Sequence, residues 1–263
     1  MQKLYALAFT LLAAAIYIPA AAQSNDHRLD AYDVEYNVDR IAHSNGYTML
    51  MGSGIQQAGA YTGCGVELDA TTAALASDMP AISGQVASVI SDGQGGWYIG
   101  GYIDAVDNVP VGNLIHIKAD KTLDASFTPK PSGYVSALAL AGTTLYIGGI
   151  FDQVYGQDRN SIAAINLSTG TLLPWNPNAN SFVRAIEISG TTIYVGGEFT
   201  SIGGQPRSRL AALDATTGLA TSWAPAVDYI IMSMAVQSST NTIFIGGFFD
   251  SAGGQVRNGL AQL

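Results

Sequence analysis

The sequence predicts an all-β protein, and three observations carry the prediction. A strand-like segment with a glycine pair, clearest at residues 191–200, recurs along the chain, and the first glycines of its copies fall at 52, 100, 148, 196 and 246. Thirty glycines stand beside only 12% charged residues, which is typical of many short strands joined by tight turns. No segment shows a convincing amphipathic helix of useful length. The near-constant spacing indicates a repeat architecture.

Each repeat follows one plan, clearest in the third. Val135, Leu138 and Leu140 lie in a first apolar strand, and residues 143–151, rich in β-branched and aromatic side chains, form a second. A loop of about ten residues, as the turn-rich composition indicates, leads to a third strand at 161–167 and a short fourth at 171–175. Pro177 ends the unit, because proline cannot donate a hydrogen bond to a sheet ladder.

Four short strands per repeat predict a β-propeller of four-stranded antiparallel blades. A single small sheet cannot bury both of its faces, whereas copies stacked around an axis can. The glycine pair would let a strand pass close to its neighbours. Five repeats are expected at about 38–85, 86–133, 134–181, 182–229 and 230–263, the last of them incomplete. The main alternative is an open β-solenoid, whose rungs are usually shorter.

The repeats resemble a known family. Residues 194–218 (YVGGEFTSIGGQPRSRLAALDATTG), 172–186 (LLPWNPNANSFVRAI) and 123–129 (LDASFTP) are similar to the delta-60 repeat family. The resemblance covers the chain from about residue 38 and is weaker in the first repeat, where Gly52-Ser53 replaces the glycine pair. It implies a β-propeller in a secreted or cell-surface bacterial protein. It implies no defined activity.

The first 22 residues have the outline of a secretory signal peptide. Lys3 gives a positive start, an apolar run follows, and small residues precede a cleavage site near Ala22 and Gln23. An uncleaved anchor is the alternative. We expect a secreted, periplasmic or cell-surface protein, with no later stretch apolar enough to span a membrane.

The two ends of the repeat region leave two possibilities open. Residues 23–37 are polar and acidic, and the last repeat stops at Leu263 within its third strand. The N-terminal segment could supply a strand that closes a five-bladed ring. Otherwise the chain is a piece of a longer protein with further blades or a C-terminal sorting domain, and the abrupt ending favours this second possibility.

Charge and cysteine content exclude two kinds of chemistry. A net charge of −9 leaves no basic surface for nucleic acid. Cys64 is the single cysteine, so no intramolecular disulfide can form, and we expect it to be a buried packing residue. No histidine or acidic spacing typical of a metal site is found, and no cofactor is expected.

Candidate binding residues recur at fixed places in the loop after each second strand. Arginines lie 11 residues after the first glycine of three repeats, and aspartates lie four residues after it in two: Arg159, Arg207, Arg257, Asp152 and Asp250. They could form a set of sites for anionic or sugar ligands. Alternatively, each arginine is a loop staple that satisfies carbonyls or carboxylates within its own blade, the better interpretation for residues that recur once per repeat.

The leading hypothesis for function is a non-catalytic binding module that acts on a protein or glycan ligand at the cell surface. No catalytic residue can be assigned from the sequence. A carbohydrate-binding propeller with one site between each pair of blades is the alternative. An extracellular enzyme, such as a glycosidase or quinoprotein, is a second alternative, and fold alone does not decide among them.

Overall fold

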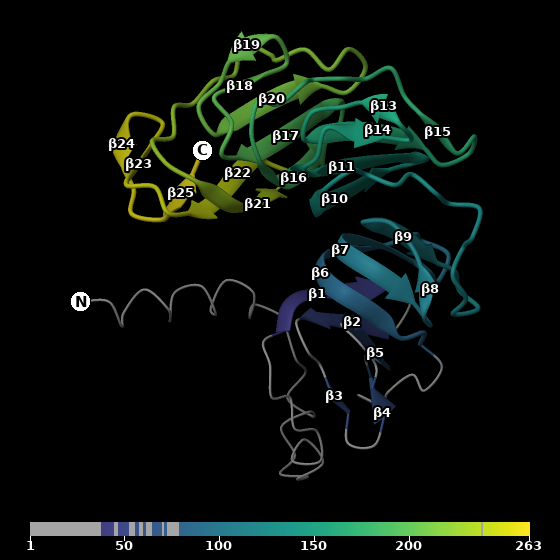
Figure 1. The fold of residues 1–263 in the computed structure, drawn as a ribbon. Helices are drawn as coiled ribbons and strands as arrows, with labels where there is room; N and C mark the ends of the chain where they lie inside the picture. Colours follow the sequence, from purple (N-terminus) through teal and green to yellow (C-terminus); the bar gives the residue numbers. More distant parts are fainter. Residues whose placement is uncertain are drawn as a thin grey trace, which may run out of the picture. The chain divides into compact units, whose positions relative to one another are not determined.

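The computed structural model describes residues 79–237 and 239–263, with strands and a turn at 38–44, 47–52, 56–57, 60–61, 65–69 and 71–72. The regular elements in these ranges are all strands, joined antiparallel into small sheets (Figure 1). The all-β prediction is therefore confirmed. The proposed signal peptide, the segment 23–37 and Cys64 lie outside the described residues.

The third blade shows the repeat most completely. Its sheet has the order β10 (Tyr134–Ala141), β11 (Thr144–Ile150), β14 (Ile162–Asn166) and β15 (Thr171–Leu172), and a small hairpin of β12 (Gln153–Val154) and β13 (Gln157–Asp158) projects between β11 and β14. Blade one holds β1 (Val38–Ser44), β2 (Tyr47–Gly52), β5 (Gly65–Asp69) and the hairpin β3 (Gln56–Gln57) and β4 (Ala60–Tyr61). Blade two holds β6 (Ile82–Ser91), β7 (Trp97–Val106), β8 (Val109–Pro110) and β9 (Leu114–Ile117).

The last two blades follow the same plan with three strands in each main sheet. Blade four holds β16 (Val183–Ser189), β17 (Thr192–Gly197), β20 (Leu210–Asp214) and the hairpin β18 (Ser201–Ile202) and β19 (Gln205–Pro206). Blade five holds β21 (Ile231–Gln237), β22 (Thr242–Gly247), β25 (Leu260–Gln262) and the hairpin β23 (Ser251–Ala252) and β24 (Gln255–Val256).

The fourth strand is shorter than the sequence predicts. In blade three β15 has two residues, and in blades two and four the fourth strand is reduced to the single bridges Ile117–Leu123 and Leu213–Ala220. The loop after the second strand is in turn more ordered than expected, because it folds into the small hairpin. Gly203 and Gly204 both have positive φ there, as a two-residue type I′ turn requires.

The strand pairing of the first repeat is offset by one residue from the glycine spacing in the sequence, which takes Gly52 as the first glycine of its pair. Met51 pairs with Gly65 in the same way that Gly100 pairs with Leu114, so Gly52 takes the place of the second glycine of the pair. A repeat with a single glycine at this point fits either position, and only strand pairing decides between them.

Glycine pairs allow the blades to pack closely. The first strands pack on one another in chain order, from β1 through β6, β10 and β16 to β21. A Cβ atom added to Gly148 would lie 2.5 Å from Val183 Cγ1 of the next blade. At the second position, a Cβ on Gly149 would collide with the backbone carbonyl of Tyr134 in its own blade. Both glycines are therefore required by steric contact.

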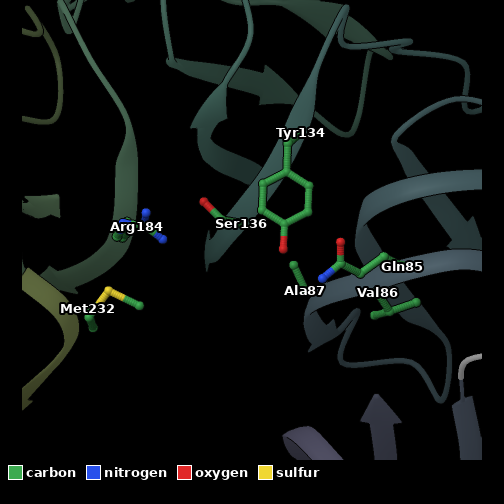
Figure 2. Close-up of a pocket in the computed structure, with 7 residues that line it drawn as sticks. All are labelled: Gln85, Val86, Ala87, Tyr134, Ser136, Arg184 and Met232. Carbon is green, nitrogen blue, oxygen red and sulfur yellow. The ribbon is translucent and has the colours of Figure 1, made fainter. Parts of the chain in front are cut away.

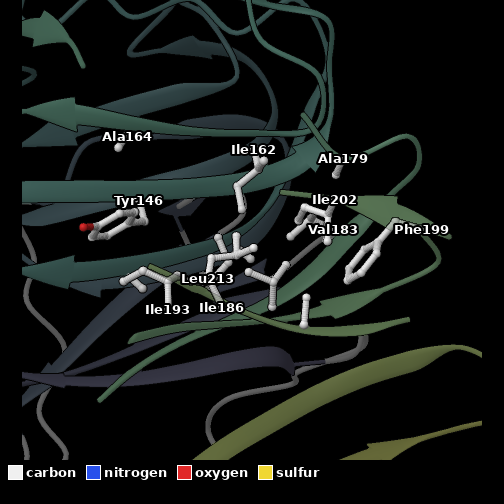
Figure 3. Packing of buried hydrophobic residues seen from close by; sticks show 14 of the residues in the cluster. Tyr146, Ile162, Ala164, Ala179, Val183, Ile186, Ile193, Phe199, Ile202 and Leu213 are labelled. Carbon is white, nitrogen blue, oxygen red and sulfur yellow. The ribbon is translucent and has the colours of Figure 1, made fainter. Parts of the chain in front are cut away.

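Apolar side chains fill the space between blades three and four (Figure 3). Ile162 of blade three and Val183, Ile193 and Leu213 of blade four are fully buried in this cluster. Trp175 packs edge-on against Tyr146, with ring centroids 5.1 Å apart. The Trp175 indole N–H donates to the backbone carbonyl of Asp214 at 3.1 Å. Burial of such surface is the main stabilising contribution to the stack.

We predict that Gly148→Ala destabilises the protein by about 1–3 kcal/mol, because the added methyl group overpacks the contact with Val183. Gly246→Ala in blade five is the matched control, since the nearest atom there among the described residues is the Ser233 hydroxyl, which can rotate away. Thermal and urea unfolding of both variants should rank Gly148→Ala as the less stable. Equal losses would contradict this account of the glycine pair.

Glu187 places an ionisable side chain on the first strand of blade four, beside apolar packing. It pairs across the strands with Tyr194, at the register where blade three has Ala139 opposite Tyr146. Burial raises the pKa of the Glu187 carboxyl to about 7. Between its ordinary pKa of 4.5 and about 7, the folded state holds a proton that the unfolded state releases. The free energy of unfolding therefore falls as pH rises through this window.

We predict that Glu187→Gln removes this pH dependence, because the amide carries no titrating proton. Urea unfolding at several pH values between about 4.5 and 7.5 should show a flatter profile for the variant than for the wild type. Asp158→Asn, on the exposed β12–β13 hairpin, is the control and should keep the wild-type slope. Parallel profiles for Glu187→Gln and wild type would refute the assignment.

Candidate functional site

A one-residue bulge interrupts the first strand of each blade at the same place. The irregularity falls between Val86 and Ser88, between Val135 and Ala137, and at the equivalent positions of β1, β16 and β21. The extra residue stands outside the ladder, and a bulge re-aims its side chain. In blades two to five these residues are Ala87, Ser136, Arg184 and Met232.

The four bulge residues line one cavity of about 220 Å³ (Figure 2). Gln85, Val86 and Tyr134 complete its lining. In Figure 2 Gln85, Ala87 and the Tyr134 hydroxyl lie on one side, and Arg184 and Met232 lie on the other. One repeated backbone feature thus brings side chains from four blades to a common site.

Three aromatic rings stand beside this cavity, and we call Tyr102, Tyr134 and Phe182 the aromatic rim. The Tyr102 and Tyr134 ring centroids are 4.6 Å apart, and those of Tyr134 and Phe182 are 5.9 Å apart with an edge-on arrangement. Tyr102 is 50% exposed. The rim therefore presents an aromatic surface to solvent next to the polar cavity.

Arg184 is held in place by two neighbours. Its Nε donates to Glu198 Oε1 at 2.7 Å, and its Nη2 donates to the same oxygen. Its guanidinium carbon lies 4.1 Å from the centroid of the Phe182 ring, a cation–π contact. Deeper in the cavity, the buried Ser136 hydroxyl donates to the Val183 carbonyl at 2.7 Å. The polar groups are thus fixed in position before any ligand arrives.

The sequence-predicted arginines lie elsewhere, at the hairpins after the second strands. Arg159 donates from Nη1 to the Asp158 carbonyl at 2.7 Å and from Nη2 to the Leu173 carbonyl at 2.8 Å. Arg207 makes the equivalent bonds to the carbonyls of Pro206 and Thr221. Arg257 donates to the Val256 carbonyl at 2.8 Å. These are contacts that a loop staple makes, while a binding role for these residues stays a prediction.

The sequence-predicted aspartates are connected to those arginines by backbone hydrogen bonds. The Arg159 N–H donates to the Asp152 carbonyl at 2.8 Å, and the Arg257 N–H donates to the Asp250 carbonyl at 2.7 Å. The Asp250 N–H also donates to the Asp228 carboxylate at 3.1 Å. The structure therefore brings each predicted pair together in its own blade, away from the cavity of the bulge residues.

A second cavity, of about 240 Å³, borders one of these loops. Thr200 and Arg207 of blade four line it, together with residues 224–226 on the way to blade five. Thr200 stands at the repeat position that Asp152 and Asp250 occupy in their blades. One of the residues selected from the sequence, Arg207, thus contributes to a hollow in blade four.

Blade two contains a cluster that the sequence did not reveal, in which a histidine lies between two carboxylates. His116 Nε2 lies 3.1 Å from Asp92 Oδ2, and His116 Nδ1 lies 3.0 Å from Asp124 Oδ2. The imidazole stacks on Tyr98, with centroids 4.4 Å apart. Within the described residues, no set of three or more His, Cys, Asp or Glu side chains is arranged to hold a metal ion.

Hydrogen bonds hold the two carboxylates in their ionised form. Burial opposes ionisation of Asp92, but the N–H of Gln94 and the hydrogen bond with His116 outweigh it and lower the Asp92 pKa. The pKa of Asp124 is lowered in the same way, against burial, by Ser126 and His116. The cluster ties the first turn of blade two to its third strand and closing turn.

The comparisons with known proteins agree with the fold. A family model described as "Domain of unknown function (DUF5122) beta-propeller" matches residues 192–216, which span the second strand of blade four, the hairpin after it and the third strand. This match supports a propeller-type repeat family. No curated protein matches the chain. In the described part of the chain, no helix has the length and apolar character needed to cross a membrane.

Solved structures show the same architecture at low sequence identity. A chain of the mitotic checkpoint complex is 19% identical with a TM-score of 0.55, over 80% of this chain and 58% of that one. The computationally designed Ika8 protein is 15% identical with a TM-score of 0.51, over 81% and 56%. The extracellular domain of a putative one component system from B. thetaiotaomicron is 13% identical with a TM-score of 0.53, over 86% and 27%. The chain thus spans less than two thirds of each of these proteins and has a β-propeller fold.

We predict that His116→Phe lowers the free energy of unfolding by about 2 kcal/mol at pH 7, because it keeps a ring on Tyr98 but leaves two carboxylates without their partner. Lowered carboxylate pKa values stabilise the fold above the ordinary value of 3.8, and this stabilisation is lost as pH falls through the folded values. The difference between variant and wild type should therefore shrink in acid.

Urea unfolding at pH 7 and at about pH 2.5 tests this prediction. Asp104→Asn, an exposed change on β7 of the same blade, is the control and should unfold close to wild type at both values. Unchanged stability of His116→Phe at pH 7 would show that the cluster contributes nothing.

Proposed function

We propose that this protein is a non-catalytic binding module that takes its ligand at the aromatic rim and the cavity behind it. The exposed Tyr102 ring carries this proposal, together with the ring contacts through Tyr134 and Phe182 that connect it to Arg184. An aromatic surface next to a cavity with a few placed polar groups is the usual form of a ligand site. Rings that already contact one another lose little freedom on binding, which favours affinity.

The polar groups of the site support binding rather than turnover. Arg184 is engaged by Glu198, and the Ser136 hydroxyl donates to a backbone carbonyl. A nucleophile or general base needs a partner that activates it toward substrate. These side chains are instead arranged to hold one another, as a rigid recognition surface requires.

We further propose that the module works outside the cytoplasm, as part of a secreted or cell-surface protein. The signal-peptide pattern of residues 1–22 supports this location. One of the similar structures is an extracellular domain, which agrees with the proposal. The delta-60 repeat resemblance, which extends beyond the matched residues 192–216, points to the same compartment.

Within this proposal, a carbohydrate is the ligand class that the rim favours. The half-exposed Tyr102 ring offers a flat apolar face, and the Gln85 side chain lines the adjoining cavity. Sugars combine apolar C–H faces with hydroxyl groups, so rings and amides side by side match both. The cavity lined by Arg207 lies where blade four leads to blade five. It is a second candidate location for such a ligand.

A glycan array with purified protein tests the function. We expect binding by the wild type and at least a tenfold loss for Tyr102→Ser, because the change removes the stacking surface. Ser208→Trp, which would fill the cavity at Arg207, should leave binding unchanged. Leu219→Ser, on an exposed turn of blade four, is the control for surface changes in general.

The outcomes separate the alternatives. Loss of binding in Ser208→Trp alone would move the site to the loop cavity. The array could show no glycan binding while the wild type captures a protein ligand and Tyr102→Ser does not. That result would support a binding module at the aromatic rim but would make its ligand a protein instead of a carbohydrate. Turnover of a glycoside that survives Tyr102→Ser would overturn the proposal.

A further inference from the structure

Apolar side chains are exposed at one recurring position, directly after the glycine pair. The residue there is Tyr102 in blade two, Ile150 in blade three and Phe248 in blade five, and each is 49–58% exposed. A side chain that maintains the repeat is buried, as Ile147 of β11 is. Exposed apolar side chains that gather on one surface mark an interaction site. This position is therefore a candidate for ligand contact.

In blades two and three these side chains form one continuous surface through Tyr134. Tyr134 of β10 pairs across the strands with Ile150 of β11, and cross-strand partners point to the same side of a sheet. The Tyr134 ring centroid also lies 4.6 Å from that of Tyr102. We call Tyr102, Tyr134 and Ile150 the apolar strip. Because Tyr134 lines the cavity of the bulge residues, the strip begins at that cavity.

The cavity itself is small. Its volume of about 220 Å³ lies below the roughly 300–1,000 Å³ of pockets that enclose a drug-sized ligand. Val86, Ala87 and Ser136 in its lining are buried side chains within packed blades. A ligand much larger than a single sugar ring must therefore continue over the exposed side chains beside the cavity.

Blade four offers such a ligand less apolar surface than the strip does. Its residue at the position of Ile150 is Glu198, whose carboxylate already accepts hydrogen bonds from Arg184. The Phe182 ring holds the Arg184 guanidinium carbon 4.1 Å from its centroid, so one of its faces is occupied. The apolar surface that leads away from the cavity therefore runs over blades two and three.

We propose that the ligand is an oligosaccharide with one sugar unit in the cavity and the following units on the apolar strip, where Ile150 is a contact residue. This inference rests on the proposed function, in which the cavity and the aromatic rim bind a carbohydrate. The C–H faces of successive sugar rings match apolar side chains, and their outer hydroxyl groups stay hydrated. Each unit that covers part of the strip buries further apolar area, so affinity rises with chain length.

A chain-length series tests the proposal. The probes are cello-, malto-, chito-, xylo- and manno-oligosaccharides, each as a series from the monosaccharide to the hexasaccharide. An array identifies the series that the wild type binds, and calorimetric or NMR titrations in solution then give the dissociation constants of its members. We expect the hexasaccharide of that series to bind at least tenfold more tightly than the monosaccharide.

Variants of Ile150 locate the chain. Ile150→Glu introduces the residue that blade four carries at this position, so it is compatible with the fold. It should weaken hexasaccharide binding at least fivefold and leave monosaccharide binding unchanged, because it alters the strip and not the cavity. Ile150→Leu keeps an apolar side chain and is the matched control, which should retain the wild-type dependence on chain length.

The remaining outcomes overturn the proposal in distinguishable ways. Equal affinity for the monosaccharide and the hexasaccharide, or unchanged hexasaccharide binding by Ile150→Glu, would confine the ligand to the cavity and leave the proposed function standing. Loss of hexasaccharide binding in Phe248→Ser, with Ile150→Glu unaffected, would place the chain on blade five instead of the strip. No binding of any series would contradict the carbohydrate ligand itself, and this inference with it.

Discussion

The fold depends on one close contact, the seating of a β-branched side chain of each blade on the glycine of the blade before it. Val183 reaches Gly148 in this way, and any larger residue at the glycine would separate the two sheets. The second glycine brings the two strands of a hairpin together over a backbone carbonyl. Buried aromatic and aliphatic side chains can then close the remaining space, as Trp175 and Tyr146 do. Burial of apolar surface stabilises the stack, but the glycine pair sets the distance at which it can occur.

The loops after the second strands and the bulges of the first strands have different roles in the repeat. In blades three, four and five, the loops after the second strands are held by arginine contacts inside the blade, such as that of Arg159 with the Leu173 carbonyl. The bulges of the first strands hold nothing in the ladder and instead point side chains into a shared cavity. Contacts that recur among blades three to five therefore maintain the repeat, and residues that differ from blade to blade give the cavity its chemistry.

Much of the fold follows from the sequence, because spacing and turn residues repeat. Residues 143–151 and 161–167 were expected as strands and contain β11 and β14. The fourth strand was overestimated, since residues 171–175 read as strand by composition but have only two ladder partners. The hairpins with Gly203-Gly204 could have been recognised, because consecutive glycines between polar residues favour a type I′ turn. The register of the first repeat could not, since Gly52 alone fits two positions.

The candidate site was harder to predict for a physical reason. Arg184 and Tyr134 lie 50 residues apart, in different blades, and only packing brings them to one cavity. A trace of the bulge was nonetheless present: Val135 and Leu138 are separated by three positions where a regular strand would give two. His116 likewise meets Asp92 and Asp124 through folding, with no spacing that marks the set in advance.

The bulge has a consequence for how such a protein can change over time. Ala87, Ser136, Arg184 and Met232 differ in size and charge, yet each sits at a backbone position that takes no part in strand pairing. If the cavity binds a ligand as proposed, substitution there would alter which ligand is recognised and leave the scaffold intact. Duplication of a blade adds one more such position. The residues that maintain the fold are therefore different from those that line the cavity. The lining of the cavity can change by single substitutions without loss of the fold.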